Sequence, residues 1–66
     1  MNRLTLQTAI WLDNATGVLK QIKNEAEHRK QCKYELGDTA SNDVYANVKN
    51  ILDKAIDEIN KEFEKL

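Results

Sequence analysis

The sequence contains no proline, two glycines, one cysteine and four aromatic residues among its 66 positions. Because proline and glycine are the residues that most often interrupt helices, and aromatic residues favour strands, this composition predicts an all-α fold. The single cysteine, Cys32, has no partner for an intrachain disulfide and belongs to no Cys/His cluster of zinc-finger spacing. A reducing, cytoplasmic location is therefore the expectation.

The sequence also lacks a long hydrophobic run and a strong excess of one charge. Thr5, Gln7 and Thr8 interrupt the apolar residues near the N-terminus, so neither a signal peptide nor a membrane span is predicted. The net charge is −1, which disfavours broad nucleic-acid binding driven by phosphate neutralisation. The charges are uneven, however. Residues 20–33 hold five basic against two acidic residues, and residues 34–66 hold four lysines against eight acids.

The C-terminal third has the clearest periodicity. Its apolar residues recur at intervals of three and four, which is typical of one face of an amphipathic helix: Val44, Val48, Ile51, Leu52, Ala55, Ile56, Ile59, Phe63 and Leu66. We predict a helix over about residues 41–65. Because this apolar sector is wider than one neighbouring helix can cover, we interpret it as an inner helix of a bundle.

A longer helix is predicted over about residues 4–36. Its apolar sector is expected to meet the second helix, and consists of Leu4, Trp11, Leu12, Ala15, Val18, Leu19, Ile22 and Ala26. Gly17 could break the helix near residues 13–17, but we favour a continuous one. Gly37 suits the position after a helix end, and the polar residues from Asp38 onward suit a helix start. The whole chain, 1–66, is then one antiparallel helical hairpin, with Leu19, Leu52 and Ile59 in its core.

The two predicted helices differ in length, which points to self-association. If the chain reverses near residue 39, Ile22 lies beside Ile56 and Leu12 beside Leu66, so residues 1–11 project by roughly 16 Å at 1.5 Å per residue. A domain of this size buries so little surface that a lone hairpin would be only marginally stable. We expect a homo-oligomer, a dimeric four-helix bundle being favoured over larger assemblies. Its candidate interface residues are Leu4, Leu6, Ile10 and Trp11. The alternative is that residues 1–12 form a separate short helix folded across the end of the hairpin.

A cluster of cations occupies the end of the hairpin near the turn. Arg29 and Lys33 fall in the same sector as the core residues of the first helix, close to Tyr45 and Val48. In one interpretation their aliphatic stems cover apolar surface while their charges reach water. In the other they form an anion site for a phosphate, a nucleotide or a carboxylate of a partner. The candidate residues of that site are Arg29, Lys30, Lys33, Tyr34 and Tyr45.

Motifs for catalysis and metal binding are weak. Glu25 and His28 have the Glu-x-x-His spacing of di-iron bundles, but His28 falls nearly opposite the apolar sector, and His28 with Cys32 would be only half of a zinc site. We therefore expect no metal, no cofactor and no enzymatic activity. The sequence favours a small helical binding protein, a regulator or inhibitor of a macromolecular partner, most simply another protein. Sequestration of a phosphate-bearing ligand at Arg29 and Lys33 is the alternative.

Overall fold

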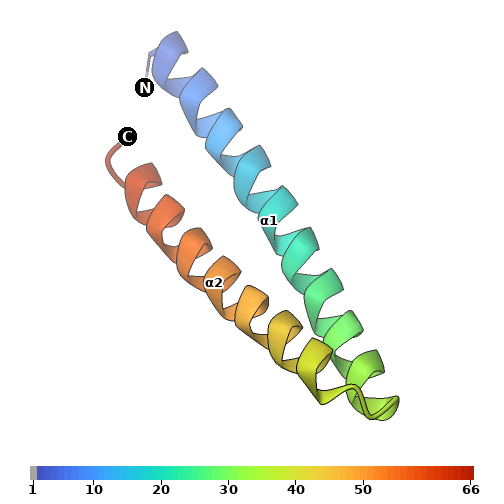
Figure 1. Ribbon diagram of the computed structural model, residues 1–66. Helices are drawn as coiled ribbons and strands as arrows, with labels where there is room; N and C mark the ends of the chain where they lie inside the picture. The colour runs from blue at the N-terminus through green and yellow to red at the C-terminus, as the bar shows by residue number, and fades with distance from the viewer. Residues whose placement is uncertain (1) are drawn as a thin grey trace.

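The computed structural model describes residues 2–66 and contains two α-helices, α1 (Arg3–Glu35) and α2 (Thr39–Phe63). The helices run antiparallel, side by side, and a short turn joins them (Figure 1). The predicted all-α hairpin is therefore confirmed, with helix boundaries one or two residues from the predicted ones. No helix in the described part of the chain is long and apolar enough to cross a membrane.

Helix α1 is continuous over 33 residues. The Asn2 side chain caps its first turn by accepting a hydrogen bond of 2.8 Å from the backbone N–H of Thr5. Gly17 lies within the helix and does not interrupt it. The alternative of a separate short helix over residues 1–12 is thus wrong, because α1 runs without a break from Arg3 through this segment; residue 1 lies outside the described residues.

The turn is built from residues that satisfy the backbone groups at both helix ends. Gly37 has a φ of +78°, and its N–H and that of Asp38 donate to the carbonyls of Tyr34 and Lys33 at 3.1 and 2.9 Å. The Asp38 carboxylate then caps α2 by accepting a 3.0 Å hydrogen bond from the backbone N–H of Ser41. This bond, helped by the charge of Lys33, lowers the pKa of Asp38.

Along the line of contact between the helices, the residues of α1 that are most deeply buried against α2 are small, and half-buried leucines such as Leu19 flank them. Ala9, Thr16 and Ala26 of α1 are buried, as is Ile56 of α2. The buried Thr16 hydroxyl donates to carbonyl oxygens of the preceding turn, those of Leu12 and Asp13, both at 3.0 Å. Small side chains let two helix axes approach closely, whereas bulky ones on the same line would hold them apart.

This contact line corrects the predicted face of α1. Leu4 and Trp11 were expected to point towards the second helix but are 73% and 66% exposed, and Val18 and Ile22 are also exposed. On α2 only about half of the predicted sector meets α1. Leu19, Leu52 and Ile59, predicted as core residues, lie along the contact but are only half-buried. Both helices are rotated so that their most apolar sides lie beside the contact line rather than on it.

Ion pairs between the helices lie on the other side of that line. Lys23 reaches Asp53 at 2.6 Å, and Lys49 reaches Glu27 at 3.3 Å. At 100° per residue these four side chains project from the side opposite to Val18 and Ile22 on α1 and to Val44 and Ile51 on α2. All four remain partly exposed, so each pair contributes at most about 1 kcal/mol. Their main effect is to fix which side of the hairpin is polar.

The hairpin is a single layer with no enclosed interior. Its Cα atoms span 52 × 15 × 9 Å, and no large side chain of the described residues is fully buried. Helix α1 extends beyond the end of α2 (Figure 1), as the unequal lengths predict. The uncovered part is shorter than the predicted residues 1–11, because Ala9 is buried, and among the described residues outside α1 it is the C-terminal part of the chain that lies nearest to it (Figure 1).

Candidate interaction surface

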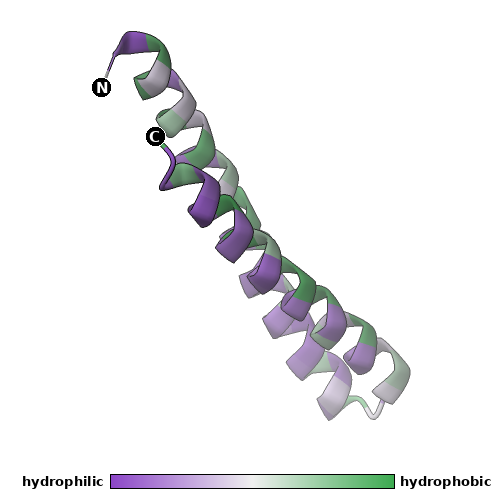
Figure 2. Ribbon diagram, turned by 90° about the vertical axis from the view of Figure 1, so that its left-hand side faces the viewer, coloured by the Kyte–Doolittle hydropathy of each residue, from purple (hydrophilic) through white to green (hydrophobic). Residues whose placement is uncertain are grey.

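One broad side of the hairpin is apolar on both helices. On α1 the exposed residues Leu4, Trp11, Val18 and Ile22 follow one another at intervals of seven, seven and four. These intervals keep side chains on one side of a helix. Figure 2 shows the hydrophobic colour gathered along one side of the molecule and the hydrophilic colour along the other. The polar side is the one that carries the ion pairs between the helices.

Helix α2 contributes a matching exposed row. Val44, Val48 and Ile51 are 59%, 37% and 64% exposed, although all three belong to the apolar sector of this helix. We call the combined surface the apolar face and define it by the exposed residues of both rows: Leu4, Trp11, Val18, Ile22, Val44, Val48 and Ile51. Monomeric soluble proteins rarely expose so many large apolar side chains contiguously. The apolar face therefore has the composition of an interaction surface.

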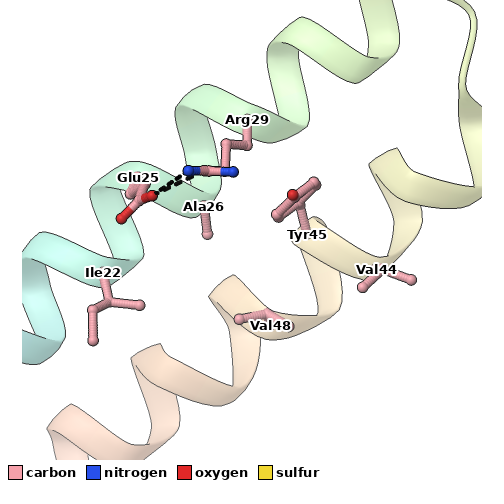
Figure 3. A pocket seen from close by; sticks show the side chains of 7 residues that line it. All are labelled: Ile22, Glu25, Ala26, Arg29, Val44, Tyr45 and Val48. Carbon is pink, nitrogen blue, oxygen red and sulfur yellow. Dashed lines mark hydrogen bonds and ion pairs between the residues drawn. The ribbon is translucent and has the colours of Figure 1, made fainter.

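A groove of about 280 Å³ crosses the apolar face near the turn. Figure 3 shows its walls: Ile22 and Ala26 come from α1, and Val44, Tyr45 and Val48 come from α2. Glu25 and Arg29 stand at its edge on α1. A hydrophobic groove with a polar group at one rim is suited to an apolar side chain. A second, shallower depression near the N-terminus is lined by Leu4, Gln7, Thr8 and Trp11, which places Leu4 and Trp11 on the same side of α1.

Arg29 is already paired within its own helix. Its Nε donates to Glu25 Oε1 at 2.9 Å, and its Nη2 lies 2.7 Å from the same oxygen (Figure 3). The neighbouring Tyr45 hydroxyl, and after it Glu25, raise the pKa of Arg29. The predicted proximity of Arg29 to Tyr45 is confirmed, since both line the groove. The Glu25 carboxylate thus competes with any external anion for the Nε and Nη2 donors of this guanidinium.

Apart from Tyr45, the other predicted anion-site residues do not line the groove with Arg29. Lys30 lies 3.9 Å from Glu27, and its backbone carbonyl accepts a 2.9 Å hydrogen bond from the Asn42 side chain. Lys33 is half-buried at the turn, where its charge acts on Asp38. Tyr34 is exposed and does not line the groove. Of the five residues, only Arg29 and Tyr45 share one cavity.

The predicted interface residues divide between two sides of α1. Leu4 and Trp11 belong to the apolar face. Leu6 and Ile10 are also exposed, but at 100° per residue they project from the far side of the helix, away from both Trp11 and α2. They form a small separate patch. The seven-residue spacing of Leu4, Trp11 and Val18 is the signal in the sequence that distinguishes the two sets.

His28 and Cys32 approach each other on the exposed side of α1, with Cys32 Sγ 3.8 Å from His28 Nε2. Within residues 2–66 no group of three or more His, Cys, Asp or Glu side chains is arranged to hold a metal ion. Two neighbouring ligands alone leave a tetrahedral zinc site half-filled. This pair by itself therefore does not define a metal site.

Comparisons with protein-family models, with curated proteins and with solved structures find no match to this chain.

Proposed function

We propose that this protein is a non-enzymatic helical binding protein that works by association through its apolar face, as a regulator or inhibitor of another macromolecule. The observation that carries this proposal is the distribution of exposure. The large side chains Trp11 and Ile51 are 66% and 64% exposed, while the residues buried between the helices are mostly small. Such a hairpin keeps many of its large apolar side chains available for contact with another chain.

The chemistry of the apolar face supports binding rather than catalysis. Aliphatic and aromatic side chains supply contact area, but they provide neither a nucleophile nor an acid–base pair. The two charged groups at the groove, Glu25 and Arg29, bind each other. A helical partner whose apolar residues recur at intervals of three and four would fit a surface formed by two parallel rows. A cytoplasmic location, in which Cys32 stays reduced, is part of the proposal.

Capture of partners with matched variants tests this function. The immobilised protein, exposed to a lysate of its source cells, is expected to retain a protein that Ile51→Glu no longer retains. The control is Asn50→Glu, which adds the same charge at an exposed neighbouring position off the apolar face. Equal capture by the native protein and Ile51→Glu would contradict a role for this face. Intact-mass analysis identifies what is bound.

The alternative, sequestration of a phosphate-bearing ligand at Arg29 and Lys33, has weaker support because both cations already have acidic neighbours, Glu25 and Asp38. Titration with nucleotides and inorganic phosphate, for the native protein and for the Arg29→Gln/Lys33→Gln variant, tests it. A phosphate site should bind less tightly as ionic strength rises, and the variant should lose binding. Binding that is unchanged in the variant would exclude these residues.

A further inference from the structure

We propose that the partner on the apolar face is a second copy of this chain, packed face to face and antiparallel, with Trp11 of each copy inserted in the groove of the other. This inference rests on the proposed function, because it names the chain that binds the same surface and the direction in which that chain runs. Three features of the hairpin lead to it, namely its area, the position of Trp11 and the distribution of charge.

The broad side of the hairpin has the size that a stable dimer contact needs. It measures 52 Å by 15 Å between Cα atoms, a projected rectangle of about 780 Å² that includes its polar margins. Stable protein interfaces typically bury roughly 800 Å² on each partner. A second copy presents an apolar face of the same length with the same rows of exposed side chains. Two copies packed face to face can therefore bury each other's apolar face.

The position of Trp11 favours the antiparallel direction. Trp11 precedes Gly37 by 26 residues and therefore lies about 39 Å from the turn. When two 52 Å copies overlap fully in opposite directions, this indole lies about 13 Å from the turn of the other copy. The groove is at that level, because Val44 and Val48 follow Gly37 by 7 and 11 residues and therefore lie about 11 and 17 Å from the turn. A parallel dimer would instead set the projecting end of α1 beyond the end of α2 of the other copy, leaving Leu4 uncovered.

The charges bordering the apolar face favour the same direction. Arg29 continues the α1 row seven residues after Ile22, near the turn, and Glu58 and Glu62 continue the α2 row after Ile51, at the open end. In the antiparallel arrangement Arg29 of each copy lies at the level of Glu62 of the other, about 40 Å from that copy's turn. A parallel dimer would instead set the two Arg29 side chains, each already paired with Glu25, at one level. It would place Glu58 and Glu62 of both copies together at another level, where among the described residues only Lys65 offsets the four carboxylates.

The native cysteine provides a direct test of direction. Cys32 is exposed and lies about 8 Å from the turn, so a nitroxide spin label can be attached without substitution. In an antiparallel dimer the two labels are separated by about 36 Å along the bundle, whereas in a parallel dimer they lie at the same level. Electron–electron distance measurement should give a distance near or above this value. A distance shorter than about 25 Å would overturn the antiparallel arrangement.

Sedimentation analysis with matched variants tests the contact itself. The native protein should be a dimer at micromolar concentration, and Trp11→Ala should raise the dimer dissociation constant at least tenfold. The control variant is Ile10→Ala. Ile10 is exposed and adjacent to Trp11 in the sequence but lies off the apolar face, so this substitution should leave the dimer dissociation constant unchanged within about twofold. A monomeric native protein, or equal effects of the two variants, would overturn the inference. Circular dichroism of both variants establishes that any loss of dimer is not loss of helix.

The two proposals fail in different ways. If the native chain is monomeric but loses a captured partner in Ile51→Glu, the self-association is wrong and the binding function stands. If the chain dimerises through Trp11 and captures nothing, the self-association stands and binding of a macromolecule is wrong.

Discussion

Two isoleucines five residues apart on α2 provide the sharpest test of the fold and of the apolar face together. Ile56 is 7% exposed and packs against α1, whereas Ile51 is 64% exposed on the apolar face. The substitutions Ile56→Ala and Ile51→Ala remove the same atoms from the same helix. Any difference in their cost therefore reports the environment of the side chain rather than its chemistry or its helix propensity.

The structure sets the expected magnitudes. Truncation of a buried isoleucine costs about 2–5 kcal/mol of unfolding free energy, and Ile56→Ala should fall in the lower half of this range because the hairpin has little interior that can keep a cavity open. For a lone hairpin, Ile51→Ala should cost less than about 0.5 kcal/mol. If a second chain covers the apolar face, Ile51→Ala should instead cost about 1–3 kcal/mol, and only at concentrations where the complex forms.

Thermal and urea denaturation, monitored by circular dichroism across a hundredfold range of protein concentration, measures both effects. In a chain of this size 1 kcal/mol shifts the melting temperature by about 4–8 °C, so the two cases are readily separated. A cost below about 1 kcal/mol for Ile56→Ala would refute the pairing of the helices along this line. An Ile51→Ala variant as stable as the native protein at every concentration would refute a covered apolar face.

Two further predictions concern the two glycines and the Asp38 cap. Gly37→Ala should destabilise the protein by about 1 kcal/mol, because φ is +78° at this position. Gly17→Ala should stabilise it by about 0.5–1 kcal/mol, since an added β-carbon in this helix meets no atom within 4 Å. Changes of the melting temperature in the same direction for both variants would contradict this. Because folding lowers the pKa of Asp38 from its usual value of 3.8, the ionised carboxylate stabilises the folded protein above that pH. This stabilisation is lost as the pH falls through the lower pKa of the folded state. The melting temperature should therefore fall in this acid range, and Asp38→Asn, which keeps the cap, should reduce that fall; an equal fall in both proteins would contradict the assignment.

Local signals in the sequence were sufficient for the secondary structure. The lack of proline, the three-and-four spacing of apolar residues and the position of Gly37 predicted two helices and a turn within one or two residues of those observed. These features depend on interactions within a few residues, namely backbone hydrogen bonds, caps and steric limits on φ. The Asp38 cap was recognisable for the same reason, because its partner Ser41 is three residues away.

The predicted sites fared differently. The proximity of Arg29 to Tyr45 followed from the hairpin register, since the two residues lie at similar distances from the turn. The pairing of Arg29 with Glu25 is an i, i+4 contact that the sequence also contained, and it makes an anion site at this end less favourable. The separation of Leu6 and Ile10 from Leu4 and Trp11 follows from the helical period and was predictable from the sequence. The side of α1 that meets α2 was predicted only in part, because Ala26 is buried and Leu19 half-buried as expected, whereas Leu4 and Trp11 are exposed.

The sequence by itself determined that two amphipathic helices form and that their apolar surface exceeds what one hairpin can bury, because periodicity and composition are properties of each segment alone. Only the tertiary structure decided how that surface is divided. Close approach of the helices is possible where Ala9, Thr16 and Ala26 are small, so the contact line follows these residues. Lys23 and Asp53 pair on one side of it. The larger apolar residues, Trp11 among them, are consequently left together on the other side, where they form a single exposed face.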